Sequence, residues 1–213
     1  MIENFDISGW LFERLFRYRN KCNILVFNYV IHLVSYIKGV KIGKKVVFNG
    51  FPRIRRNENS KILIGDNCIF NSAKNSVSVG LQKRCTFVTL KKNSEIIIGN
   101  NTGGSGITLL AAIKIKIGNN VMIGAHSMII DTDFHHPNPN KRHDSIDIPA
   151  RPIVIEDNVF IGTNCMILKG ITIGENSVIG ANSVVINSIP KNSIAIGNPC
   201  KVVIIKKWDL PPQ

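Results

Sequence analysis

Histidine, aspartate and proline residues gather in one segment of this chain, residues 131–152. The segment holds three of the five histidines, namely His135, His136 and His143. An imidazole exchanges a proton near neutral pH, so a reacting group can lose or gain a proton there. The prolines of the segment cannot donate to a strand ladder, which favours a loop, and loops on a rigid scaffold often carry function. The segment therefore indicates proton-transfer chemistry in a loop.

A six-residue period indicates the elements that position this loop. Aliphatic residues occupy every sixth position after it: Ile155, Ile161, Ile167, Ile173, Ile179 and Val185. The same spacing precedes it at Ile117, Ile123 and Ile129. Six is a multiple of two but not of 3.6, so the period marks one face of an extended strand and would be scattered around a helix.

Turn residues separate these short extended segments. Examples are Gly118-Asn119-Asn120 and Gly174-Glu175-Asn176, whose residue types tolerate bends and left-handed backbone. A single repeat cannot bury its own apolar face, so we expect stacked repeats around one core, an all-β solenoid. The period is out of register by two residues between Ile129 and Ile155. Residues 131–152 are therefore predicted to leave the solenoid as an extruded loop.

The pattern resembles the hexapeptide-repeat acyltransferases, in particular those that O-acetylate sugars and polysaccharides. The resemblance is clear over residues 113–203, weak over 61–110 and nearly absent over 1–60. It implies a left-handed parallel β-helix with three hexapeptides in each coil. It also implies a homotrimer whose active site lies between neighbouring subunits.

The repeats, together with the apolar stretch at residues 24–37, predict the domain organisation. Residues 1–40 form an N-terminal helical or irregular cap, residues 41–203 the β-helix domain, and residues 204–213 a C-terminal tail.

The resemblance also implies a catalytic base. The segment Asp131-Thr132-Asp133-Phe134-His135-His136-Pro137 is similar to the family's D-x-D-F-H segment, whose histidine is the general base, which assigns this role to His135. His136 is the alternative, because the maltose and galactoside acetyltransferases have their histidine before a proline. A base is required because a sugar hydroxyl is a poor nucleophile until its proton is taken. Asp133, Asp131 or a backbone carbonyl would orient the ring. His143 is expected to be a solvated loop residue, and His126 a structural turn residue or part of the acceptor groove.

A donor site is implied near the C-terminus. The family signature Gly-x-Pro-(Ala/Cys)-(Lys/Arg) is matched by Gly197-Asn198-Pro199-Cys200-Lys201. The resemblance places Lys201 beside the phosphates of an acyl-CoA, where a cation is favourable, and Thr163 and Ala181 along the pantetheine arm. A lysine that the family often has before its Asp-Ile-Pro is missing here, and Lys191 is its candidate replacement. Acetyl-CoA is therefore the expected donor, and no metal is expected to be required.

Charge and composition limit the partners and the location. The formal net charge is +13, and residues 1–60 hold 11 Lys or Arg against 4 Asp or Glu. Such a region attracts anionic membranes, acidic glycans or nucleic acid. No nucleic-acid-binding motif accompanies it, so we do not expect nucleic acid to bind. Aromatic and basic residues within 10–37 would suit peripheral contact with the inner membrane face, or a helical cap on the solenoid. Five irregularly spaced cysteines and no evident signal peptide predict a cytoplasmic protein.

These observations predict an acetyl-CoA-dependent O-acetyltransferase that acts on a hydroxyl of a sugar or of a surface-polysaccharide precursor (capsule or lipopolysaccharide). Nucleotide-sugar N-acetyltransferases and serine O-acetyltransferases use the same scaffold, but their additional N-terminal domains are absent. A γ-carbonic-anhydrase-like zinc protein would need three converging histidines, with His126, His135 and His136 as candidates. That fold lacks the motif at 197–201. A non-catalytic solenoid is the last alternative.

Overall fold

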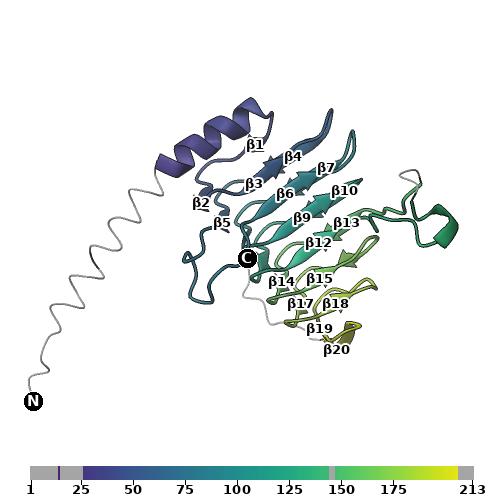
Figure 1. Cartoon of the computed structure of the whole chain (residues 1–213). Helices are drawn as coiled ribbons and strands as arrows, with labels where there is room; N and C mark the ends of the chain where they lie inside the picture. The colour runs from purple at the N-terminus through teal and green to yellow at the C-terminus, as the bar shows by residue number, and fades with distance from the viewer. Residues whose placement is uncertain (1–13, 15–25, 144–146, 206–213) are drawn as a thin grey trace, which may run out of the picture.

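The computed structural model describes residue 14, residues 26–143 and residues 147–205. Its strands wind around one core as a three-sided prism (Figure 1). Three consecutive strands form one coil, and every third strand joins the same sheet. Neighbouring strands within a sheet are parallel, as between β10 and β13, with one antiparallel exception at the C-terminal end. The architecture is the predicted left-handed parallel β-helix.

The three sheets, called A, B and C here, have the following strands. Sheet A contains β1 (Lys41–Ile42), β4 (Lys61–Ile64), β7 (Glu95–Ile98), β10 (Lys114–Ile117), β13 (Ile153–Ile155) and β16 (Thr172–Ile173). Sheet B contains β2 (Val47–Asn49), β5 (Ile69–Asn71), β8 (Gly103–Ser105), β11 (Met122–Ile123), β14 (Phe160–Ile161), β17 (Val178–Ile179), β19 (Ser193–Ile196) and β20 (Lys201–Ile205). Sheet C contains β3 (Arg53–Arg55), β6 (Thr86–Thr89), β9 (Thr108–Ala111), β12 (Met128–Ile130), β15 (Met166–Ile167) and β18 (Val184–Val185).

The residues of the six-residue period form the core, as predicted. Ile155, Ile161, Ile167, Ile173 and Ile179 are all buried. Register explains this: Ile117 pairs with Ile155 and Ile155 with Ile173, so equivalent residues stack along the prism. Removing these side chains from water stabilises the fold by roughly 1.5–3 kcal/mol for each buried Ile. Towards the N-terminal end three phenylalanine rings fill the same interior: Phe48 stacks on Phe70, and Phe70 meets Phe87 edge to face.

The corner between sheets A and B is held by a ladder of asparagine side chains. Each amide nitrogen donates to the amide oxygen one coil further on, at 3.0–3.1 Å. The members are Asn101, Asn120, Asn158, Asn176 and Asn192, and all have positive φ. Asparagine tolerates this left-handed backbone better than other residues with a side chain. These asparagines therefore both adopt the left-handed backbone of the turns and join neighbouring coils through side-chain hydrogen bonds.

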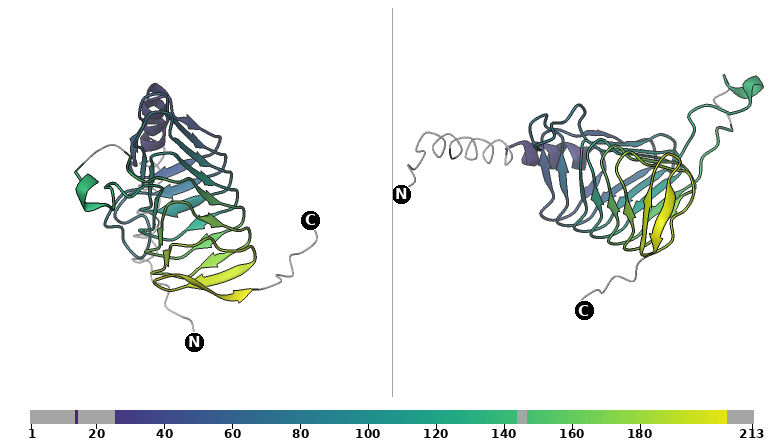
Figure 2. Two further views of the ribbon diagram at one scale, coloured as in Figure 1. Left: turned by 90° about the vertical axis from the view of Figure 1, so that its right-hand side faces the viewer. Right: turned by 90° about the horizontal axis from the view of Figure 1, so that it is seen from below.

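Two insertions interrupt the coils, and only one was predicted. Residues 131–143 and 147–152 leave the prism between β12 and β13, and this loop stands away from it, with a short 3-10 helix η1 (Pro139–Lys141) on it (Figure 2). The second insertion, residues 72–85, lies between β5 and β6 at the corner between sheets B and C. In the next coil only Gly106 and Ile107 make this connection, between β8 and β9.

A helix covers the open N-terminal end of the prism (Figure 1). Residues 26–37 are helical, and Ile31 and Ser35 are buried against the first coil. The Asn28 side chain accepts from the Phe48 N–H at 2.7 Å and donates to the Phe48 carbonyl at 3.0 Å. Both backbone polar groups of Phe48, in the edge strand β2, thereby have a hydrogen-bond partner. The assignment of residues 1–40 as a separate cap stays a prediction.

The outer face of this helix is apolar. Tyr29, Leu33, Tyr36 and Ile37 are exposed there. Among the described residues, no helix is long and apolar enough to cross a bilayer. Peripheral membrane contact through residues 10–37 stays a prediction, and most of residues 10–25 lie outside the part that the structure describes.

Candidate active site

The base of the histidine loop is fixed to the solenoid by Asp131. This side chain is fully buried, and its carboxylate accepts three backbone N–H groups of the preceding coil. The donors are Ala112 at 2.6 Å, Ile113 at 2.8 Å and Lys114 at 2.7 Å. Burial raises the pKa of Asp131, while the backbone donors act in the opposite direction. Asp131 therefore positions the loop and is not available to orient a histidine.

We expect Asp131→Ala to destabilise the protein by about 3–5 kcal/mol, because one buried and two partly buried N–H groups lose their acceptor and each unsatisfied buried group costs roughly 1–3 kcal/mol. Thermal unfolding followed by circular dichroism measures the effect. Glu58→Ala is the control, since it removes an exposed carboxylate that pairs only with Lys92 at the surface. Such a pair contributes about 0–1 kcal/mol. An Asp131→Ala protein that unfolds at the wild-type temperature would contradict this role.

Short contacts also close the neck of the loop. Thr132 and Ala150 form an antiparallel bridge, and the Asp133 N–H donates to the Pro149 carbonyl at 3.1 Å. The Asp133 carboxylate pairs with Lys169 of the next coil at 2.5 Å. Asp133 therefore anchors the loop through Lys169 in this structure, and no hydrogen bond from Asp133 to a histidine occurs among the described residues.

The two adjacent histidines differ in their hydrogen bonding. The His136 Nδ1 atom accepts the Asn138 N–H at 3.0 Å, so the proton of its neutral ring lies on Nε2. A protonated Nε2 cannot accept a proton from a substrate. The His135 ring is exposed, and no hydrogen bond occupies it among the described residues. This geometry favours His135 as the ring that can take a proton.

The residue before His135 has an unusual backbone. Phe134 has φ of 63° and an exposed ring. A bulky side chain rarely adopts this left-handed conformation, which costs of order 1–3 kcal/mol and persists where the surrounding structure imposes it. The bend turns the chain directly ahead of His135.

The predicted donor residues lie at the corner between sheets B and C. Thr163 follows β14 and Ala181 follows β17, and the Asn182 N–H donates to the Thr163 carbonyl at 2.8 Å. A Cβ on Gly124 would lie 2.5 Å from the Thr163 nitrogen, and a Cβ on Gly162 would lie 2.6 Å from the Ala181 nitrogen. The backbones of neighbouring coils therefore approach closely at this corner, which carries the small side chains of Thr163 and Ala181.

The Gly197–Lys201 segment completes this corner at its C-terminal end. Gly197 has φ of 107°, and its N–H donates to the Ser183 hydroxyl at 3.0 Å. The Asn198–Pro199 peptide bond is cis. Lys201 begins β20, is exposed, and has no ion pair within the described part of the chain. Thr163, Ala181 and Gly197 thus follow one another along a single edge of the prism, as consecutive coils require.

The histidine loop and the donor corner lie on opposite edges of sheet C (Figure 1). The loop leaves between sheets C and A, after β12, whereas Thr163 and Ala181 lie between sheets B and C. A strand of sheet C therefore separates them within one chain. His126 lies at the donor-side corner with φ of 65°, and its Nε2 accepts the Gln82 N–H at 3.2 Å. His126 is therefore a structural turn residue that holds the insertion 72–85.

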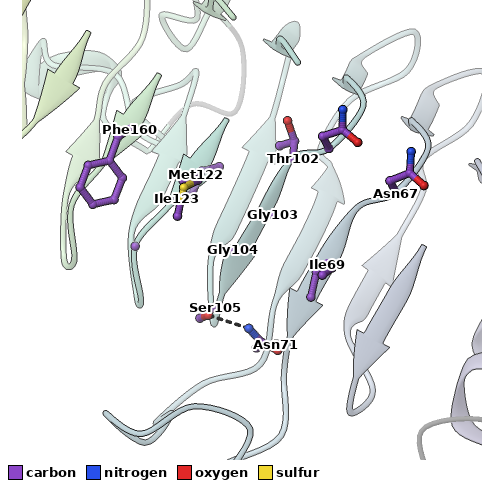
Figure 3. A pocket seen from close by; sticks show the side chains of 12 residues that line it. Asn67, Ile69, Asn71, Thr102, Gly103, Gly104, Ser105, Met122, Ile123 and Phe160 are labelled. Carbon is purple, nitrogen blue, oxygen red and sulfur yellow. Dashed lines mark hydrogen bonds between the residues drawn. The ribbon is translucent and has the colours of Figure 1, made fainter. Parts of the chain in front are cut away.

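The outer face of sheet B is hollowed where β8 has two glycines. The hollow is about 420 Å³ and has Gly103 and Gly104 at its floor, with Ile69, Met122 and Phe160 around them (Figure 3). Asn71 donates to Ser105 at 3.0 Å at one end. Within the described residues, no group of three His, Cys, Asp or Glu side chains is placed to hold a metal ion.

Comparison with known proteins places this fold. The family model described as bacterial transferase hexapeptide (six repeats) matches residues 152–187. A putative acetyltransferase of Saccharomyces cerevisiae is 43% identical over 111 residues, covering 52% of this chain and 56% of the relative. Galactoside O-acetyltransferase of Escherichia coli is 38% identical over 111 residues, covering 52% and 54%. The chain thus spans about half the length of these relatives.

A solved structure agrees over more of the chain. AntD, an N-acyltransferase from Bacillus cereus in complex with dTDP and 3-hydroxybutyryl-CoA, superposes with a TM-score of 0.62 at 18% identity. The match covers 83% of this chain and 88% of that chain, and at this identity it supports the fold alone.

The coils, their turns and the extruded loop define a hexapeptide-repeat protein of the left-handed parallel β-helix class. Residues 152–187 thus carry the hexapeptide repeat of bacterial transferases, and about half of the chain is similar in sequence to acetyltransferases, in agreement with the predicted resemblance.

Sequence reasoning did not find the insertion at 72–85 or the anchoring role of Asp131. A signal for the insertion was present: Ile64 and Ile98, which pair in the structure, are not a multiple of six apart. No local signal marks Asp131, because its partners belong to the preceding coil.

Proposed function

We propose that this protein transfers an acyl group from acyl-CoA to a hydroxyl of a sugar, with His135 as the general base. The observation that carries the proposal is the hydrogen-bonding difference between the two histidines. His135 is exposed on an anchored loop and its ring has no hydrogen bond to any described residue, whereas His136 accepts the Asn138 N–H. The hexapeptide-repeat match and the similarity to a galactoside O-acetyltransferase support the reaction class.

The proposed reaction has two steps, attack on the thioester and collapse of the tetrahedral intermediate. His135 takes the proton of the acceptor hydroxyl as its oxygen attacks the thioester carbonyl, which gives a tetrahedral oxyanion. The oxyanion then collapses, the carbon–sulfur bond breaks, and the protonated imidazole returns its proton to the leaving thiolate. The products are the acyl ester and free CoA. Asp131 and the Asp133–Lys169 pair hold the loop during this exchange.

The donor binds, in this proposal, along the corner between sheets B and C. Thr163 and Ala181 would contact the pantetheine arm of the donor, and Lys201 supplies a cation for its phosphates. Acetyl-CoA is the donor that we propose, as for the acetyltransferases among the relatives.

We also propose that a homotrimer completes the site. His135 and the donor corner lie on opposite edges of sheet C, so a neighbouring copy is needed to bring a loop against a donor corner. The outer faces support such packing. Sheet A presents charged side chains such as Lys61, Glu95 and Lys114, whereas sheets B and C present Met122, Phe160 and Met166. A closed ring of three copies would bury the apolar faces.

An acceptor screen tests the proposed activity. The purified chain is incubated with acetyl-CoA and single acceptors, and free thiol is measured over the rate without acceptor. We expect thiol release with hydroxyl acceptors from the sugar and diphosphate-linked sugar classes, and an acetyl ester in the product by mass spectrometry. Thiol release only with amino sugars would show that the acyl group is transferred to nitrogen and not to oxygen. No acceptor-dependent release from any acyl-CoA would overturn the proposal. A surface-polysaccharide role and a cytoplasmic location stay predictions.

A further inference from the structure

The unpredicted insertion 72–85 builds a basic groove at the N-terminal half of the prism. The groove is about 550 Å³, and its charged lining residues are Arg53, Lys74, Lys83 and Arg84, with Phe51 at the mouth. No acidic side chain lines it. Among the described residues, none of the four cations forms an ion pair. Four cations without counter-ions therefore share one concave surface.

The strands and the loop bring these cations together. Arg53 pairs in register with Thr86, so Arg84, two residues earlier, enters the neighbouring strand beside it. Lys74 and Lys83 lie on the two arms of the insertion, which the Leu81 N–H joins by donating to the Lys74 carbonyl at 2.8 Å. The strand register therefore positions Arg53 and Arg84, and the loop positions Lys74 and Lys83.

The insertion is anchored rather than loosely attached. Leu81 is buried, the Cys85 N–H donates to the Ser72 hydroxyl at 3.0 Å, and the Gln82 N–H donates to His126 two coils further on. A Cβ on Gly106 would lie 2.7 Å from the Lys83 carbonyl, so the loop lies directly on the next coil. Partial burial of the ammonium lowers the pKa of Lys83.

We propose that the basic groove binds the diphosphate of a diphosphate-linked sugar, the acceptor of the proposed acyl transfer. The guanidinium groups of Arg53 and Arg84 match phosphate oxygens in pairs, and the two ammonium groups add point charges. Two adjacent phosphates would supply the counter-charge that the groove lacks. Phe51 offers an exposed ring for a sugar or base beyond them. Calling the ligand an acceptor rests on the proposed function, whereas the diphosphate site itself does not.

Position along the prism separates this groove from the donor residues. Both occupy the corner between sheets B and C, but the groove belongs to the coils of β3 and β6, while Thr163 and Ala181 belong to those of β14 and β17. Adjacent coils lie about 4.8 Å apart. The groove therefore extends the same edge beyond the predicted donor path, where an acceptor would approach.

Calorimetric titration with inorganic pyrophosphate tests the site without catalysis. We expect binding to weaken at least about 30-fold in Arg53→Ser/Arg84→Ser, which removes two charge-assisted contacts. The control is Lys41→Ser/Lys44→Ser, which removes the same charge from exposed positions near sheet A. It should bind within about threefold of wild type, since exposed distant charges are screened. Equal losses in both proteins would overturn the site by showing only a net-charge effect. Thermal unfolding confirms that each variant is folded.

Two further titrations identify the source of the diphosphate. A nucleoside diphosphate sugar should compete with pyrophosphate in the wild-type protein and lose affinity in the groove variant. CoA should bind both proteins equally. Loss of CoA binding in the groove variant would assign the groove to the donor and overturn the acceptor assignment. If the acceptor screen finds no acyl transfer while pyrophosphate still binds through the groove, the site stands and the proposed function falls.

Discussion

Replacing His135 by Ala should lower kcat/KM for acyl transfer by about 10²–10⁴-fold, the range that a positioned general base contributes. Without the imidazole, water must take the proton of the acceptor hydroxyl as the thioester is attacked. His136→Ala should stay within about threefold of wild type, because its Nδ1 atom accepts the Asn138 N–H and its Nε2 atom holds the ring proton. Steady-state thiol release from acetyl-CoA gives both values.

The pair of variants distinguishes a base from a loop residue. Both histidines lie in the same exposed turn, so a general disturbance of the loop would affect the two proteins alike. A large loss in His136→Ala with normal turnover in His135→Ala would move the base to His136. Normal turnover in both would exclude the mechanism. Unfolding temperatures within a few degrees of wild type are required of both proteins, since neither side chain is buried.

Replacing Ala181 by Trp should raise the KM for acetyl-CoA by about 100-fold, equivalent to a loss of about 2.7 kcal/mol of binding. Ala181 is exposed at the corner between sheets B and C, directly beyond Gly162 and Thr163 of the preceding coil. An indole there would occupy the corner along which we propose that the pantetheine arm binds. Initial rates over a range of acetyl-CoA concentrations measure the change.

Thr172→Trp is the matched control for this effect. Thr172 is exposed in β16 of the same coil, but on sheet A, away from the donor corner. Its KM for acetyl-CoA should stay within about threefold of wild type, since exposed substitutions away from a site have small effects. An unchanged KM in Ala181→Trp would show that the donor does not bind along this corner.

The sequence predicted the parts of this fold that repeat. Ile117, Ile155 and Ile173 stack because a strand's inward face is set by a side-chain period, which is visible without knowledge of the fold. The loop was visible because its insertion shifted that period. Residues 72–85 also shift it, but the period is fragmentary around Ile64 and Ile98, so the change of register passed unseen.

The parts that depend on distant contacts were not predictable. Asp131 and Asp133 were equivalent candidates in sequence, and only the structure distinguishes them: one is bound to the backbone of the preceding coil and the other to Lys169 of the following coil. His135 and His136 were likewise separated by resemblance alone, until the Asn138 contact gave a physical difference.

Mixing two inactive proteins tests most directly whether the active site forms between copies of this chain. His135→Ala and Ala181→Trp are co-expressed with different tags, and complexes that carry both tags are isolated and assayed at a limiting acetyl-CoA concentration. A ring in which one copy supplies the histidine and its neighbour the donor corner should regain about a third of wild-type turnover, since one of the three interfaces in each mixed trimer combines two intact parts. A chain carrying both substitutions, mixed with wild type, controls for exchange of subunits. Mixed complexes that stay as inactive as either variant alone would contradict a site shared between copies.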